Sequence, residues 1–180
     1  YSYGGTEVKA TFSVIVRAQA DGADVIDAVN NAEEGETVTL DAFTTYVFRD
    51  VLDLDKKITV RGGEDTVLDF SEGNAEGKAF RTTDANNEAN NFAVGLVNIY
   101  ADGVSLENVK IVGDLDKAVS EGEQDMSAND SEMKAAYGIF ISRYEKNADT
   151  GKSATVNVKE TITLRNVEIT ETALSGIYAY

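Results

Sequence analysis

Three oxygen-bearing side chains at alternating positions form the most suggestive metal-binding pattern in this sequence. Asp84, Asn86 and Glu88 stand two residues apart, and calcium loops supply their carboxylate and amide ligands at such alternating positions. The segment lacks the turn glycine expected at the sixth position and the bidentate glutamate expected at the twelfth, where Gly95 stands. The pattern predicts calcium as the one candidate cofactor, with Asp84, Asn86 and Glu88 as its ligands.

Two aspartate pairs have the spacing that paired-carboxylate chemistry uses. Asp53 with Asp55, and Asp114 with Asp116, are separated by one residue, which on a strand places both carboxylates on one face about 7 Å apart. Such pairs can divide acid and base roles between them. However, each pair lies at a strand edge or in a loop of a chain that has 32 acidic residues. Chance therefore explains both pairs, and we assign no catalytic residue from them.

The composition excludes several classes of site and partner. The chain has no Cys and no His, which removes thiol nucleophiles, Ser-His-Asp triads, zinc sites and haem ligands. Its 16 basic and 32 acidic residues give a net charge of −16, so nucleic acid and anionic membrane surfaces are not expected partners. No apolar run is long enough to cross a membrane. The simplest interpretation of the charge is that it keeps an exposed surface soluble.

The elements that would position any site come from a repeat. Residues 103–113 (GVSLENVKIVG) return as residues 161–170 (TITLRNVEIT), and a shorter copy occupies residues 58–63 (ITVRGG). Aligning Asn108 with Asn166 pairs apolar residues at every second position before and after the Asn, and the third copy has Gly62 at the Asn position. Asn and Gly enter the left-handed backbone region most readily, so we expect a strand, a one-residue corner and a second strand in each copy.

A second repeated motif is a glycine followed by a short apolar strand. It begins at Gly95, Gly138 and Gly176. Polar segments at residues 71–92, 114–134 and 143–154 separate the motifs and are the expected loops.

These two motifs together resemble the right-handed parallel β-helix superfamily, which has the pectin-lyase-like fold. The resemblance covers residues 22 to 180 and includes the sequence motifs Gly-Ile-Tyr and Ile-Thr-Leu-Arg-Asn-Val-Glu-Ile. It implies an all-β fold, a right-handed parallel β-helix (β-solenoid) with an N-terminal strand and a short capping helix. It implies little about activity, since this fold hosts lyases, hydrolases, adhesins and structural proteins.

Two parts of the chain follow from this interpretation. Residues 1–35 would form an N-terminal strand, over residues 4–20, and a capping helix over residues 24–34 with Asp24 as its cap and Gly35 as its stop. The strand would either cover the first coil or pair across a subunit boundary. Residues 36–180 would form the coils. Because Tyr180 ends a strand motif without a polar cap, either further coils follow it or another subunit covers this end.

The function expected from these features is a surface-exposed or secreted structural or binding module, adhesin-like or self-assembling, with no evident catalytic site. Self-association through the N-terminal strand or the solenoid end, and a glycan or surface-protein ligand, are the expected interactions. The alternative is a polysaccharide lyase or glycosidase, or a fragment of one, for which the resemblance points to Arg143 or Arg165 as the basic residue. The resemblance places the protein outside the cell or at its surface.

Overall fold

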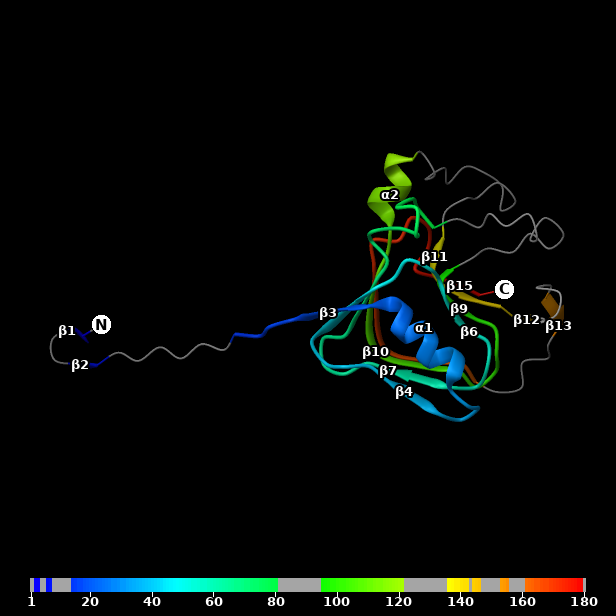
Figure 1. The fold of residues 1–180 in the computed structure, drawn as a ribbon, viewed down its shortest axis with the longest axis horizontal. Helices are drawn as coiled ribbons and strands as arrows, with labels where there is room; N and C mark the ends of the chain where they lie inside the picture. The colour runs from blue at the N-terminus through cyan, green and yellow to red at the C-terminus, as the bar shows by residue number, and fades with distance from the viewer. Residues whose placement is uncertain are drawn as a thin grey trace.

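The fold consists of two parallel sheets with a helix across one end (Figure 1). The computed structural model describes residues 2–3, 6–7, 14–80, 95–121, 136–142, 144–146, 153–155 and 161–179.

The larger sheet has seven strands, and β10 is its longest inner strand. Its order is β3 (Ala18–Asp21), β5 (Thr44–Val47), β8 (Val67–Asp69), β10 (Ser105–Val112), β7 (Thr59–Arg61) and β4 (Thr37–Thr39), and β14 (Thr163–Thr170) also pairs with β10. Each pairing is parallel. The first half of β10 pairs with β7 and the second half with β8, so the sheet curls at this strand into a half-barrel.

The second sheet has four parallel strands in the order β15 (Ile177–Ala179), β11 (Tyr137–Ile141), β9 (Gly95–Ile99) and β6 (Leu52–Leu54). Two short antiparallel pairs complete the described strands. They are β1 (Ser2–Tyr3) with β2 (Thr6–Glu7), and β12 (Tyr144–Lys146) with β13 (Ser153–Thr155).

The hydrophobic core lies between the two sheets. Alternate residues of each strand point inward, and the predicted inward set of the first repeat is buried. That set is Val104, Leu106, Val109 and Ile111. The partly buried residues packed against the same cluster include Ile162, Leu164, Val167 and Ile169 of the second repeat.

Helix α1 (Gly22–Asn31) covers one end of this core. It contacts β3 and β5 of the curled sheet and β6 of the second sheet, and it buries Val25 and Val29. The helix begins two residues earlier than predicted, because the side chain of Asp21, and not that of Asp24, accepts the N–H of Ala23. A second, short helix, α2 (Leu115–Ser120), follows β10.

The prediction of a right-handed parallel β-helix is wrong. The β-helix interpretation predicts that each Asn corner ends one strand and begins another. Instead, β10 and β14 each continue through the corner as one eight-residue strand. The two halves therefore stay in one curled sheet, and the chain forms a half-barrel with a second parallel sheet and no β-solenoid. The boundary between residues 35 and 36 remains a prediction.

The alignment of the two long repeats is the register in which their strands pair. Leu106 lies opposite Leu164, Val109 opposite Val167 and Ile111 opposite Ile169. Asn108 and Asn166 have φ values of 54° and 51°, which confirms the left-handed corner at both. The glycine motifs pair as well, but Gly95 lies opposite Tyr137, one residue from the expected alignment with Gly138.

Gly62 serves a different purpose from the two asparagines. It does not have a positive φ, and in this copy Asp65 takes the left-handed conformation instead, with a φ of 55°. Residues 62–66 of this copy stand where β10 has only Asn108 and Val109. A Cβ atom on Gly62 would lie 2.3 Å from the carbonyl oxygen of Asn108, so Gly62 is required by close backbone approach.

The single strand expected over residues 4–20 is also corrected. Residues 14–17 have no strand structure, and β3 begins only at Ala18, where it pairs with β5. Val14 and Val16 are 76% and 81% exposed, and this part of the chain leads away from the body (Figure 1). Residues 8–13 lie outside the described part of the chain.

The left-handed corner gives a testable order of stabilities. Asn108→Ala and Asn108→Gly both remove the side-chain amide, but only Ala has a Cβ that opposes a positive φ. We expect Asn108→Ala to lower the free energy of unfolding by about 1 kcal/mol more than Asn108→Gly, measured by urea titration. At Thr163, an exposed strand position without a positive φ, Gly should be the more destabilising of the two. The same order at both positions would contradict the account of the corner.

Candidate functional site

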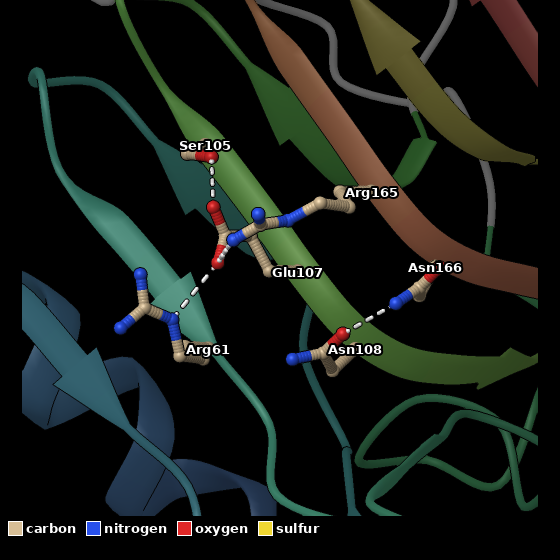
Figure 2. A network of polar contacts seen from close by, with 6 residues as sticks. All are labelled: Arg61, Ser105, Glu107, Asn108, Arg165 and Asn166. Atoms are coloured by element: carbon tan, nitrogen blue, oxygen red, sulfur yellow. Dashed lines mark hydrogen bonds and ion pairs between the residues drawn. The ribbon is translucent and has the colours of Figure 1, made fainter.

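A ladder of alternating charge crosses three strands on the outer face of the curled sheet (Figure 2). Arg61 of β7, Glu107 of β10 and Arg165 of β14 occupy one register position. Oε2 of Glu107 accepts from Nε of Arg61 at 2.8 Å and from Nη2 of Arg165 at 2.5 Å. Ser105 Oγ donates to the other carboxylate oxygen at 3.0 Å. These side chains point outward because their neighbours Val60, Leu106 and Leu164 point into the core.

The two guanidinium groups fix the charge state of Glu107. Its side chain is only 8% exposed, whereas the Arg side chains on either side are about half exposed. The hydrogen bonds from Arg165 and then from Arg61 lower the pKa of Glu107 to about 2. The carboxylate is therefore ionised across the physiological range and binds the three strands to one another.

A second ladder runs beside the first and is made of amides. Nδ2 of Asn166 donates to Oδ1 of Asn108 at 2.9 Å (Figure 2). A third contact follows two positions further along, where Lys110 of β10 forms an ion pair with Glu168 of β14 at 2.9 Å. Each of these contacts links β10 to β14, so side-chain pairing reinforces the parallel register.

The outer edge of β14 is not paired with a strand in the part of the chain that the structure describes. The N–H of Thr163 and the carbonyl of Thr170 bond toward β10. Because groups alternate along a strand, the backbone N–H groups of Leu164 and Ile169 face the other side.

Matching residues show that no described part of the chain forms a covering layer over this edge. Leu106 and Ile111 of β10 are completely buried, with 0% exposure. Leu164 and Ile169, which occupy the same register positions on β14, are only half-buried. The residue types are nearly the same, so the difference arises from position, since among the described strands β14 pairs with β10 alone. The neighbouring edge strand β15 likewise leaves Ile177 about half exposed.

Beside the amide ladder lies a shallow, open hollow. It is lined by the 62–66 loop, by Asn108 to Lys110 of β10, and by Asn166 and Glu168 of β14. The β14 side chains Asn166 and Glu168 line this hollow, and a ligand on the outer edge of β14 would meet them together with Arg165.

The structure brings Arg165 into this site but leaves other predicted residues elsewhere or undescribed. Arg143 lies outside the described residues, as do the proposed calcium ligands Asp84, Asn86 and Glu88. Within the described residues, no group of three acidic side chains could hold a metal ion.

The two aspartate pairs are split by the fold. Asp53 accepts a hydrogen bond from the buried amide of Asn98 at 2.9 Å, whereas Asp55 is exposed. The negative charge of Asp53 adds to the effect of burial in raising the pKa of the nearby Tyr100. These contacts hold β6 against β9 and serve the packing of the second sheet.

Asp114 is buried at the start of α2, while Asp116 lies within that helix. Oδ2 of Asp114 accepts the N–H of Phe80 at 2.6 Å. Burial is the main cause that raises the pKa of this carboxyl group. Asp114 therefore fixes residue 80 to the end of β10, and neither aspartate pair forms a two-carboxylate site.

Glu107 and Asn166 are the site residues that sequence reasoning missed. Aligning the repeats at Asn108 and Asn166 also places Arg165, Glu107 and Arg61 at one position. The alternation of charge along that alignment was a signal that the three side chains pair across strands.

Comparisons with known proteins give no relative from which a function could be transferred. No family model, no curated protein and no solved structure matches this chain. Among the described residues, no helix is both long and apolar enough to span a membrane.

The lowered pKa of Glu107 predicts how stability depends on pH. Because the folded-state pKa lies below the ordinary value of 4.5, the ionised form stabilises the fold above pH 4.5 and this contribution disappears as the pH falls toward 2. Glu107→Gln should therefore be less stable than the parent chain at pH 6, and the difference should shrink between pH 4.5 and 2. Urea titrations across that range measure it. A difference that does not change with pH would contradict the charge ladder.

Proposed function

We propose that this chain is a structural or binding module that receives a β-strand from a partner along the outer edge of β14. The observation that carries the proposal is the contrast between buried Leu106 and Ile111 and half-buried Leu164 and Ile169 at the same register positions. Strand addition to an exposed sheet edge is a common way for proteins to bind a peptide, with main-chain hydrogen bonds giving affinity and alternate side chains giving specificity.

The two ends of the fold differ in a way that supports this proposal. Helix α1 contacts the outer strands β3 and β6, and Lys56 donates to the carbonyl groups of Asn30 and Ala32 at its C-terminal end. The β3 and β6 edges therefore lie against a helix, as protected sheet edges often do. Among the described residues, neither helix makes comparable contact with β14 or β15.

Covering the apolar positions of the edge would give only part of the binding free energy. Completing the burial of Leu164, Val167 and Ile169 is worth about 3 kcal/mol in total, about half of the value for burial from full exposure. Association itself has an unfavourable entropy of at least that size. Backbone hydrogen bonds and side-chain ladders must therefore contribute, which makes the edge selective for particular strands.

The alternative activities, a polysaccharide lyase or a glycosidase, receive less support. A general acid needs a pKa near the working pH, and the Arg165 and Arg61 contacts hold that of Glu107 at about 2. A location outside the cell or at its surface, as in adhesin-like proteins, remains part of the proposal and rests on the resemblance of the repeats.

A displayed library of random peptides tests strand acceptance without assuming a sequence. We expect the parent chain to enrich peptides with alternating apolar residues, and we expect Leu164→Lys to abolish their binding because it places a charge at the edge. The matched control Thr39→Lys changes an exposed residue of β4 and should leave binding unchanged. Peptides that bind the parent chain and Leu164→Lys equally well would overturn the proposal.

Self-association through the N-terminal segment is a second candidate, because Val14, Ile15 and Val16 are exposed large apolar residues. Light scattering after size-exclusion chromatography, at increasing protein concentration, should then show oligomers that disappear when residues 1–16 are removed. A parent chain that stays monomeric would exclude this second candidate while leaving strand acceptance to the library experiment.

A further inference from the structure

We infer that the strand received by β14 is a parallel strand of a partner polypeptide that carries the pattern of this chain's own repeat. The inference rests on the proposed function and adds the chemistry of the partner. The pattern has an acidic residue opposite Arg165, Asn or Gly opposite Asn166, and a basic residue opposite Glu168. Apolar residues lie opposite Leu164, Val167 and Ile169.

The requirement for an acidic residue comes from the charge ladder. Charge alternates from Arg61 to Glu107 to Arg165 across consecutive strands, so the next position outward is complementary to a carboxylate. Arg165 is 59% exposed, and only its Nη2 atom has a contact within the described residues. A guanidinium group has five N–H donors, so Arg165 can bind a second carboxylate without releasing Glu107.

The requirement for a basic residue has the same origin. Glu168 pairs with Lys110 on its inner side, and its own side chain is 63% exposed. A cation on the incoming strand would face it three residues after the acidic position. Two charges of opposite sign, at a fixed spacing, select both the register and the direction of the strand.

The corner position selects a third feature. Asn166 donates its Nδ2 to Asn108, so its Oδ1 is the acceptor that faces onward, and no described residue donates to it. A further Asn would extend the amide ladder by donating its own side-chain N–H. The incoming backbone must also follow the left-handed corner of β14, where φ is 51°. Asn and Gly follow such a corner with the least strain.

Three segments of this chain, namely β7, β10 and residues 6–16, do not supply this strand from a second copy. The repeats β7 and β10 each pair on both sides, so neither is free to be donated. Residues 6–16 contain neither Asn nor Gly, so they lack the corner residue. None of these three segments of a second copy therefore fits the edge, and the occupant that we infer is a strand of a partner polypeptide.

The test uses a peptide with the sequence of residues 103–113 (GVSLENVKIVG), because β10 carries the complete pattern. Fluorescence anisotropy of the labelled peptide measures its binding to the full chain. The reversed peptide carries Glu107→Lys and Lys110→Glu, and the corner peptide carries Asn108→Ala. We expect binding to fall about tenfold or more for the reversed peptide, since two attractions become repulsions.

Variants of the protein complete the test. The double variant Arg165→Glu with Glu168→Lys should prefer the reversed peptide over the parent peptide. Because Arg165→Glu opposes Glu107 within the fold, Arg165→Gln with Glu168→Gln serves as a second variant, which should bind both peptides equally. Arg49→Gln is the matched control, since Arg49 is an exposed, ion-paired arginine outside both ladders, and it should retain the parent preference.

The outcomes separate this inference from the proposed function. Equal binding of the parent and reversed peptides to the parent chain, or no preference switch in the charge-swapped variant, would overturn the inferred pattern. If the parent peptide fails to bind while library peptides bind in a Leu164-dependent way, the pattern is wrong and strand acceptance stands. If neither peptide class depends on the edge, both proposals are wrong.

Discussion

The parallel pairing of β10 with its neighbours is the interaction on which the rest of the structure depends. Its first half pairs with β7, its second half with β8, and its whole length with β14. The left-handed corner at Asn108 is what lets one strand bend between two partners without ending. This bend curls the sheet, and the curl encloses the core against the second sheet.

The same pairing creates the site on the opposite face. A register that aligns Leu106 with Leu164 inside must also align Glu107 with Arg165 outside. The core and the charge ladder are therefore two consequences of one alignment. Among the described strands, β14 lies at an edge, so its outward-facing polar side chains form a layer that has strand neighbours on the β10 side only. We interpret this layer as the surface on which the protein acts.

The sequence allowed part of this account to be predicted. The two long copies of the repeat, which lie 58 residues apart, gave the β10 and β14 register and the buried apolar residues. This was possible because the alternation of apolar residues and the preference of Asn for the left-handed backbone region are local properties. It did not predict the architecture, since the corner at Asn108 has the same backbone whether the sheet continues through it or divides there. Only the long-range pairings of both halves decide that. The role of Glu107 depends on which strands are neighbours, and residue types alone do not give this, while Asp84, Asn86 and Glu88 lie outside the described residues.

Amide hydrogen exchange of the monomer tests most directly whether the edge of β14 is open. The account predicts that the amides of Leu164 and Ile169 exchange at least about a hundredfold faster than those of Leu106 and Ile111, whose strand is paired on both sides. Addition of a binding strand should then slow the Leu164 and Ile169 amides selectively. Equal protection of the two sets in the isolated monomer would contradict the account, because it would show that this edge is already covered.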